Sequence, residues 1–408
     1  MFLDLYNMTN MTKKELAKVT RARYKLAGKK AKSIILNEFC YNTKYHRKYA
    51  IKLFNNKPKE NKERAGRQRK YGSQLFADYI IPIWELLEYP CGIRLQPELI
   101  NIAEAMNRFN EIKLTNQIRE QLMLISGKTL DRRLKKEIEI RRLNRSRGTT
   151  RHGTLLKSSI PIRLTNWNLQ EVGFVEVDTV AHNGGDPSGE FINSLDLVEI
   201  YSGWSEQYAT MGKGERGVAN SIDEIREELP FNLTGLDSDG GSEFINWHLV
   251  RYCEKIKIYF TRSRPYMKND NAYVEQKNNT HIRKLLGYGR YDNFEQLRLI
   301  NDLYRKEWRL FNNFFKPVMK IERKEKVNNS LCRKIYDKPK TPYQRLMESG
   351  QISEEQKKKL TDLYLSLNPV ELKRKIDEKI KIIRKLGGGH SNILNVSTKA
   401  TKVTLLNV

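Results

Sequence analysis

Carboxylates occur at three places in the chain where hydrophobic patterning predicts the end of a strand or the body of a helix. Glu176 and Asp178 lie in the alternating run GFVEVDTVA, Asp237 and Asp239 close a second predicted strand, and Glu275 lies in the predicted helix NDNAYVEQKNNTHIRK. Oxygen ligands of this kind suit hard cations such as Mg²⁺. Both acids of each pair share a strand face by period-2 alternation, so periodicity alone selects neither.

The spacing of these acids resembles the integrase core shared by retroviral integrases and many insertion-sequence transposases. The chain has 35 residues between Asp239 and Glu275, which is the spacing that ends the acidic triad of that family. In the family an Asn-Gly turn follows the second acid, and here Gly240 and Gly241 follow Asp239. The resemblance therefore implies that Asp178, Asp239 and Glu275 are the catalytic residues and the metal ligands.

This resemblance implies a polynucleotidyl transferase, a DDE-type transposase of a mobile element. Three carboxylates would hold two Mg²⁺ ions, which Mn²⁺ could replace, roughly 3.5 to 4 Å apart, and these would offset the charge of the scissile phosphate. The enzyme would bind terminal inverted repeats, cleave at the element ends and join them to target DNA. A ribonuclease-H-like nuclease, which would normally bring a fourth acid, and a domesticated DNA-binding protein are the alternatives.

The charge of the chain is sorted along its length. The net charge is +27, with a pI near 9.7. Residues 165–315 hold 17 Lys and Arg against 23 Asp and Glu, so this segment carries −6 and its flanks carry +33. Basic arms around an acidic centre indicate a polyanion as partner, and we expect double-stranded DNA, both transposon ends and target. A generally Lys-rich composition is the alternative for the Lys excess alone.

Residues 1–56 are predicted to form a helix-turn-helix DNA-binding module. Ile34, Leu36 and Phe39 lie in one predicted helix, and Thr43 is a candidate cap for a second helix, KYHRKYAIKLF. Basic side chains at four-residue steps share a helix face, which would suit a DNA groove. The predicted DNA contacts are Lys44, Arg47, Lys48 and Lys52.

Residues 71–148 are predicted to form a second helix-turn-helix module. Ser126-Gly127 marks its turn, and Leu130, Leu134 and Ile138 form the buried stripe of its last helix. The predicted DNA contacts on the opposite face are Lys128, Arg132 and Arg133. An ordinary solvated helix face is the alternative for both modules.

Two basic linkers, residues 57–70 and 149–164, join these modules to the segment that follows. The first resembles the minor-groove arm called an AT hook, but Gln68 stands where the hook has Pro. The weaker expectation is that Arg67, Arg69 and Lys70 follow phosphates or a narrow minor groove. A flexible solvated linker is the alternative for each.

Residues 165–315 are predicted to form an α/β ribonuclease-H-like integrase catalytic core. Three strands come first and are followed by alternating helices and strands, with Trp204 and Trp247 expected in the core. Glu275, Asn279 and Arg283 fall at four-residue steps of the last helix, and the loop before it is basic. The predicted DNA contacts here are Arg262, Arg264, Lys268, Lys277, Asn279 and Arg283.

Residues 316–408 are predicted to be a basic, mostly helical C-terminal region with two helices and a loose tail. Its first part is predicted to be an extended segment. Ser353 with Gln356 forms a predicted capping box that starts the first helix, Asn368-Pro369 separates the two helices, and Gly387 ends the second. The predicted architecture is therefore multi-domain, with α-helical modules before the α/β core. The resemblance implies a homo-oligomer in the assembled DNA complex.

The scattered cysteines and the hydropathy bear on the compartment. Cys40, Cys91, Cys253 and Cys332 form no CxxC pair and have no His at ligand spacing, so zinc and disulfides are not expected. No apolar run reaches the ~18 residues that a membrane span needs. We therefore expect a soluble, cytoplasmic, nucleoid-associated protein.

Overall fold

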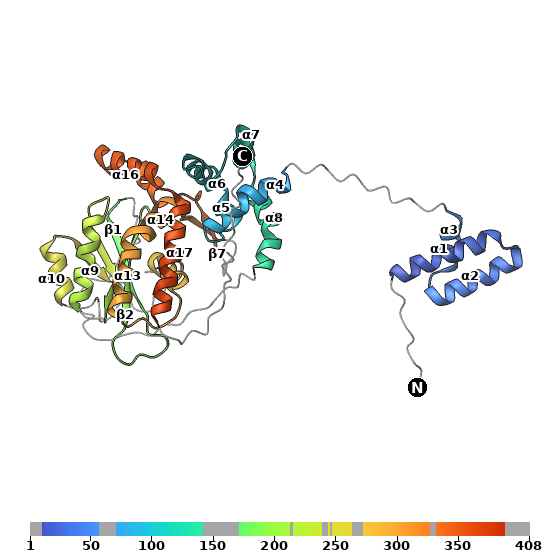
Figure 1. The fold of residues 1–408 in the computed structure, drawn as a ribbon, viewed down its shortest axis with the longest axis horizontal. Coiled ribbons are helices and arrows are strands. Elements are labelled where there is room, and N and C mark those ends of the chain that lie inside the picture. Colours follow the sequence, from blue (N-terminus) through green and yellow to red (C-terminus); the bar gives the residue numbers. More distant parts are fainter. Residues whose placement is uncertain are drawn as a thin grey trace. The chain divides into compact units, whose positions relative to one another are not determined.

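The structure is a computed structural model that describes residues 10–56, 71–141, 171–212, 215–238, 244, 247–262, 272–326 and 332–387. The chain divides into two units, residues 1–70 and 71–408 (Figure 1). No helix in the described ranges is long and apolar enough to cross a membrane.

The described part of the N-terminal unit is a three-helix bundle: α1 (Asn10–Leu26), α2 (Lys29–Thr43) and α3 (Arg47–Asn55). Phe39 and Phe54 pack with ring centroids 4.8 Å apart at its centre. The predicted start of the last helix is wrong. The Thr43 hydroxyl donates back to the Phe39 carbonyl (2.7 Å), Lys44 adopts a left-handed conformation with φ 60°, and the side chain of His46 caps α3.

A second group of helices spans residues 71–141. The bounds are α4 (Ser73–Leu75), the π-helix η1 (Phe76–Ile80), α5 (Ile81–Leu86), α6 (Gly92–Arg108), α7 (Asn116–Leu124) and α8 (Gly127–Ile140). The α6 and α8 starts touch, since a Cβ on Gly92 would lie 2.1 Å from the Gly127 carbonyl oxygen. Ser126, which belongs to the predicted turn, caps α8. The predicted stripe holds at Leu130 and Leu134, but Ile138 is 39% exposed.

A five-stranded mixed sheet forms the centre of the larger unit. Its order is β3-β2-β1-β4-β5, with β1–β2 and β2–β3 antiparallel and β1–β4 and β4–β5 parallel. This α/β arrangement is compatible with the predicted ribonuclease-H-like core. The strands are β1 (Phe174–Ala181), β2 (Ile192–Glu199), β3 (Ser205–Met211), β4 (Gly235–Ser238) and β5 (Tyr259–Arg262).

Helices cover this sheet, and its two faces differ in polarity. Val175, Val177, Leu195 and Leu197 form an apolar core with α9 and α10, which lie together on one side of the sheet in Figure 1. The α11 helix and the π-helix η2 pack on β1 and β2. The helices after β3 are α9 (Glu215–Glu228), α10 (Trp247–Lys255), α11 (Ala272–Lys277), η2 (Asn278–Arg283), α12 (Lys284–Leu286), α13 (Phe294–Leu303), η3 (Tyr304–Trp308) and α14 (Arg309–Phe315).

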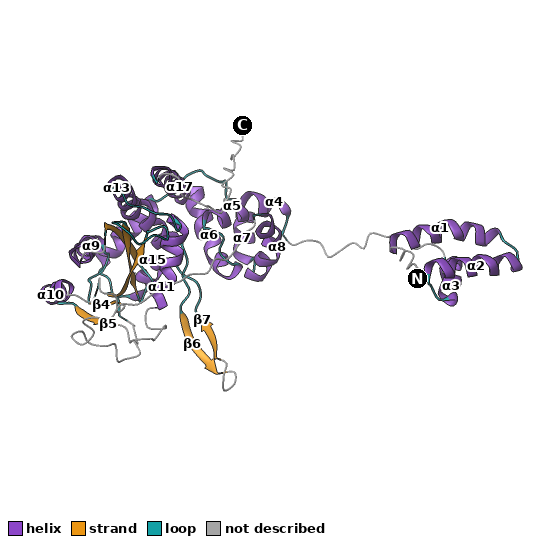
Figure 2. Ribbon diagram, turned by 90° about the horizontal axis from the view of Figure 1, so that it is seen from below, coloured by secondary structure: helices purple, strands orange, loops and turns teal. Residues whose placement is uncertain are grey.

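The C-terminal region begins with a β-hairpin that projects from the body (Figure 2). Its elements are β6 (Ile321–Lys326), β7 (Cys332–Tyr336), α15 (Pro342–Ser349), α16 (Glu354–Ser366) and α17 (Pro369–Leu386). The two predicted helices are confirmed as α16 and α17, whereas the segment predicted as extended contains a hairpin and an additional helix, α15. Antiparallel pairing of the two strands and a Thr341–Gln344 capping box account for the additional elements. The capping box of Ser353 with Gln356 is confirmed, and α17 ends before Gly387.

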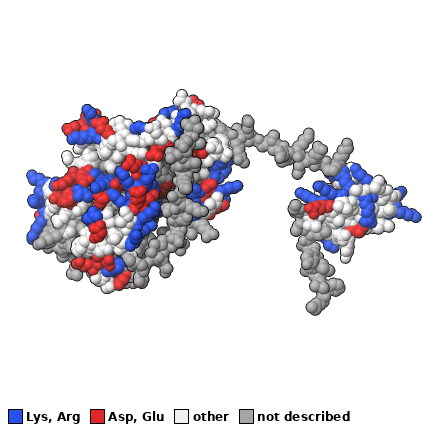
Figure 3. Space-filling model, viewed as in Figure 1, with Lys and Arg blue, Asp and Glu red and all other residues white. Residues whose placement is uncertain are grey.

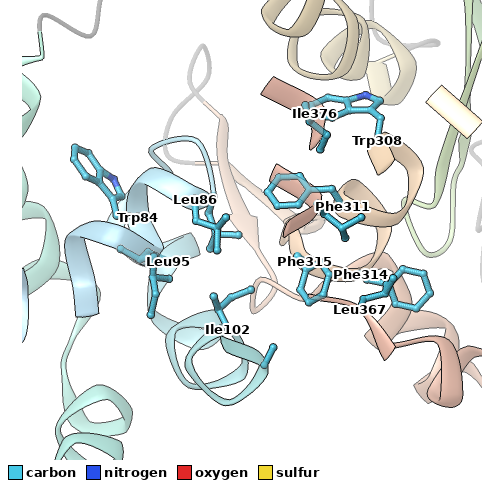
Figure 4. Packing of buried hydrophobic residues seen from close by; sticks show 14 of the residues in the cluster. Trp84, Leu86, Leu95, Ile102, Trp308, Phe311, Phe314, Phe315, Leu367 and Ile376 are labelled. Carbon is cyan, nitrogen blue, oxygen red and sulfur yellow. The ribbon is translucent and has the colours of Figure 1, made fainter. Parts of the chain in front are cut away.

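One hydrophobic core runs through residues 71–141, the helices after the sheet and the C-terminal helices. Figure 4 shows Leu86 and Ile102 from the first group near Phe311, Phe315 and Ile376 from the others. Because such apolar burial is the main favourable term in folding, these segments stabilise one another across the predicted boundaries.

An ion cluster reinforces that junction. The Glu88 carboxylate accepts hydrogen bonds from Lys316 (2.6 Å) and Lys373 (3.3 Å). Burial alone would raise the pKa of Glu88, but the two ammonium groups outweigh it and lower that pKa to about 2. Three segments far apart in sequence are thereby joined at one carboxylate.

Candidate active site

Asp178 lies in β1, on the polar face of the sheet, and is half-buried. Its Oδ2 accepts a 2.6 Å hydrogen bond from the Asn278 side-chain amide, and its Oδ1 accepts one from the Thr179 backbone N–H (2.7 Å). A carboxylate that accepts such bonds is held in one rotamer. Asp178 is therefore fixed beside the segment that follows Glu275.

Glu176, the other acid of the first pair, is fully buried and contacts backbone instead. Its Oε2 accepts a hydrogen bond from the Val274 N–H (3.2 Å), in the first turn of α11. Unpaired N–H groups at a helix start favour a carboxylate partner. This contact positions the start of the helix that carries Glu275.

Asp237, the first acid of the second pair, lies in β4. Asp237 is fully buried, and its Oδ1 accepts a hydrogen bond from the Thr261 hydroxyl of β5. The parallel register pairs Glu176 with Asp237 and Val177 with Ser238. Asp239 follows directly in sequence and lies outside the described residues, as do Arg264 and Lys268.

Glu275 belongs to α11, but its side chain is outside the described part of the structure. Within that part, no group of three His, Cys, Asp or Glu could hold a metal ion. The proposed ligand set thus includes one described carboxylate, that of Asp178.

The segment after Glu275 is a π-helix, and this changes which side chains face the sheet. A π-helix has more residues per turn than an α-helix, so the four-residue steps predicted from Glu275 do not hold. Asn278 turns toward Asp178, whereas Asn279 is exposed. Arg283 is half-buried, with its guanidinium 5.0 Å from the centre of the Tyr288 ring.

A buried polar network lies next to Asp178 between the sheet and this helix. Gln207 donates to Asp196 Oδ1 (2.9 Å), Ser205 Oγ lies 3.0 Å from His281 Nδ1, and Lys277 Nζ lies 3.3 Å from His281 Nε2. Burial raises the pKa of Asp196 to about 7, against the opposing effects of the Gln207 amide and the Lys277 charge. Burial lowers the pKa of Lys277 to about 7 and holds that of His281 well below its ordinary value.

A curated relative covers most of the chain. The uncharacterized protein y4rM of Sinorhizobium fredii is 34% identical over 339 residues, which are 82% of this chain and 95% of that protein. The chain belongs to the family of y4rM. The name of y4rM assigns no activity, so family membership leaves the chemistry to be argued from the residues.

Other comparisons add little. Among solved structures, the chain is similar to the catalytic core domain of BIV integrase, with 17% identity, a TM-score of 0.29, and coverage of 44% of this chain and 95% of that chain. No residue correspondence follows at that score. No protein-family model matches the chain.

The N-terminal unit carries most of its charge as Lys and Arg. Residues 10–56 contain thirteen Lys and Arg and two Asp and Glu, and Figure 3 shows basic side chains over much of this unit. Lys44, Lys48 and Lys52 are exposed, as the predicted DNA contacts require. Arg47 is exposed too, but it donates hydrogen bonds to Asn37 and Ser33 of α2, which joins α3 to α2.

Two of the three predicted DNA contacts on α8, Lys128 and Arg132, are exposed. The Arg133 guanidinium lies 4.3 Å from the centre of the Phe76 ring and donates to the Tyr71 carbonyl (3.3 Å). At the end of β5, Arg262 is buried, and Arg67, Arg69 and Lys70 lie outside the described residues.

Sequence reasoning missed Asn278, Asp196 and Gln207. An acid in the middle of the apolar strand INSLDLVE was a usable signal, because a charge there must find a partner or remain neutral. Asn278 lies three residues past Glu275, a spacing that also shares a helix face, and the four-residue steps used for the prediction left it out. Trp204 is buried, as predicted, and the Trp247 side chain lies outside the described part.

Proposed function

We propose that the chain is a DNA transposase that binds the terminal inverted repeats of a mobile element and catalyses DNA strand cleavage and strand transfer. The observation that carries the proposal is the Asp178–Asn278 hydrogen bond. It joins a carboxylate of the central strand to the helix that bears Glu275, on a sheet whose strand order suits a ribonuclease-H-like core.

The donor set suits divalent cations with oxygen ligands. Asp178, Asp239 and Glu275 would hold two Mg²⁺ ions, which Mn²⁺ could replace, and a neighbouring buried carboxylate oxygen, Asp196 Oδ2, has no partner among the described residues. When bound, the cations would offset the charge of the phosphate during an in-line displacement. Such chemistry needs no titratable His or Cys.

The chain's own side chains position these ligands. Asn278 holds the Asp178 carboxylate, and Glu176 holds the first turn of α11 against β1. Both contacts join the same strand to the same helical segment. They fix the spacing of Asp178 and Glu275 at the backbone before any cation or DNA binds, and preorganisation of this kind lowers the cost of reaching the transition state.

DNA would be held by the basic segments outside the sheet. We assign repeat recognition to the predicted helix-turn-helix modules, through exposed residues that include Lys48, Lys52, Lys128 and Arg132. Phosphate contacts by Lys and Arg supply much of such affinity. A second copy of the chain would join the assembled complex so that two element ends can be processed together.

One observation favours a second candidate, a ribonuclease-H-like nuclease. Asp196 supplies a fourth carboxylate directly opposite Asp178 on the neighbouring strand, and a fourth acid is expected of that group. The two functions differ in their products, since a nuclease hydrolyses DNA but joins no ends to a target.

The test uses the full chain and a duplex that carries the inverted repeats flanking its gene. With Mg²⁺, the wild-type protein is expected to nick the repeat end and to join it to a second duplex. Asp178→Asn and Asp239→Asn should abolish both reactions and leave repeat binding in a gel-shift assay nearly intact. Asp237→Asn is the matched control, because Asp237 is tied to Thr261.

Three results would count against these assignments. Activity of Asp178→Asn within tenfold of wild type would refute the metal role of Asp178. Loss of activity in Asp237→Asn together with activity in Asp239→Asn would move the second ligand to Asp237. Hydrolysis without joined products would favour the nuclease.

A further inference from the structure

Three polar side chains form a row across the sheet. In the antiparallel registers, Asp178 of β1 is paired with Asp196 of β2, and Asp196 is paired with Gln207 of β3. Directly opposite residues point to the same face, with Cβ atoms about 4.5 to 5.5 Å apart. This is the face covered by α11 and η2, so Asp196 lies next to Asp178 and beneath the helix of Glu275.

The Asp196 carboxylate is only half satisfied. Asp196 is fully buried, and Gln207 Nε2 donates to its Oδ1 at 2.9 Å. Its Oδ2 has no hydrogen-bond partner among the described residues. A buried acceptor without a donor is destabilising, and more so when charged, so such a group is usually satisfied by an ordered water or an ion.

The nearest basic side chain does not fill this role. Lys277 is close enough to affect Asp196 electrostatically, but its ammonium lies 3.3 Å from His281 Nε2. The described ion pairs do not include one between Lys277 and Asp196. Asn278 Oδ1, on the amide that contacts Asp178, is also buried without a partner. Two buried acceptors without a described partner therefore belong to residues that neighbour Asp178.

We propose that Asp196 is an outer-sphere partner of the cation held at Asp178: its Oδ2 accepts a hydrogen bond from a water of that cation, and Gln207 fixes its rotamer. This rests on the metal role given to Asp178 in the proposed function. Mg²⁺ usually keeps several waters and binds directly to one or two carboxylates, so donors for Oδ2 would be present beside Asp178. Full burial leaves Asp196 away from entering DNA, which separates its role from that of the three ligands.

Partners of this kind tune the affinity of a metal site about 10- to 100-fold. The experiment measures Mn²⁺ binding to the full chain without DNA, from the loss of the free-ion electron paramagnetic resonance signal. Asp196→Asn should bind Mn²⁺ at least tenfold more weakly than wild type. Glu98→Gln is the matched control, a buried carboxylate changed to its amide in α6, where Asn101 donates to it at 3.1 Å, and it should bind as wild type does.

A folded Asp196→Asn variant with Mn²⁺ affinity within twofold of wild type would overturn the proposal. Should that variant fail to fold by circular dichroism, Gln207→Met replaces it, because it removes the amide that orients Asp196. Gln207→Met should bind Mn²⁺ several-fold more weakly, and unchanged affinity would then overturn the proposal.

The outcome separates this inference from the proposed function. If the wild-type chain cleaves DNA and Asp196→Asn binds Mn²⁺ normally, the inference is wrong and the proposed function stands. If Asp196→Asn binds Mn²⁺ more weakly but the wild-type chain processes no DNA, the proposed transposase function is wrong and the cation site stands. A wild-type chain that binds no Mn²⁺ would contradict both.

Discussion

The side-chain amide of Asn278 donates a 2.6 Å hydrogen bond to the carboxylate of Asp178, and so joins the central strand to the helix three residues past Glu275. Asn278 is also the first residue of the π-helix η2. Insertions of this type are frequent at functional sites. Asn278 lies four residues past the buried Val274 and three past Glu275, spacings that place it on the helix face toward the strand.

Asn278→Ala should reduce DNA cleavage about 10- to 100-fold and raise the Mg²⁺ concentration needed for half-maximal rate. The reason is that the Asp178 carboxylate loses the donor that fixes its rotamer. The rate of end cleavage is measured over a Mg²⁺ titration, with repeat binding measured alongside. A change in the Mg²⁺ requirement separates loss of ligand positioning from simple unfolding.

The matched control is Gln276→Ala, an exposed side chain on the same helix, which should behave as wild type. An Asn278→Ala variant with wild-type rate and Mg²⁺ requirement would show that the hydrogen bond does not position Asp178.

The order of elements in the catalytic segment was predictable because it rests on local signals. Alternation in GFVEVDTVA and turn residues around IYSG indicate strands, and β1, β2 and β3 form where these signals lie. The neighbours of each strand depend on contacts between distant residues, such as Val177 with Ser238. No single-sequence period encodes such contacts, so the polar row across β1, β2 and β3 was not predicted.

Ile102→Ala should lower the stability of the whole larger unit, although Ile102 lies in the predicted second DNA-binding module. Ile102 is 1% exposed and belongs to the same core as Phe315 and Ile376. Truncating a buried Ile costs ~2 to 5 kcal/mol. Hydrogen exchange measured at rising temperature should show that backbone amides in residues 71–141, in α14 and in α17 lose their protection together.

Phe39→Ala, in the core of the N-terminal unit, provides the control and should leave that transition in place. Loss of protection confined to residues 71–141 in Ile102→Ala would mean that these helices fold separately.

An amphipathic helix such as α6 or α17 must bury its apolar face, but its pattern does not say which surface that face meets. The shared core arises from the fit of these stripes to one another, which is a property of three segments far apart in sequence. One continuous core therefore contains residues from three of the predicted domains.

Glu98 should make the stability of the protein depend on pH. It is buried in α6, and burial raises its pKa from the ordinary value of 4.5 to about 6, against hydrogen bonds from Asn101 and Gln344. The unfolded state therefore loses this proton first, and stability falls as pH rises from about 4.5 to about 6. Between pH 4 and pH 7 the wild-type protein should lose about 2 kcal/mol more than Glu98→Gln.

The measurement is chemical denaturation of both proteins at pH 4 and pH 7. Parallel losses of unfolding free energy in the two proteins would show that Glu98 ionises in the folded state as it does in water.

Arg132 and Arg133 are adjacent on α8 and should have different roles, although the sequence predicted DNA contact for both. Arg132 is exposed, whereas Arg133 lies over the Phe76 ring and donates to the Tyr71 carbonyl. Removing a phosphate contact releases fewer counterions on binding, so Arg132→Ala should weaken repeat binding and reduce the slope of log K against log salt by about 0.9. Arg133→Ala should leave that slope unchanged and lower the unfolding free energy by about 1 kcal/mol, since it removes a cation–π contact and a hydrogen bond.

Gel-shift titrations of the full chain between about 50 and 200 mM salt, with a thermal melt of each variant, measure both quantities. A reduced salt slope in Arg133→Ala with unchanged stability would mean that its guanidinium leaves Phe76 to contact DNA, and an unchanged slope in Arg132→Ala would mean that this face of α8 does not meet the phosphate backbone.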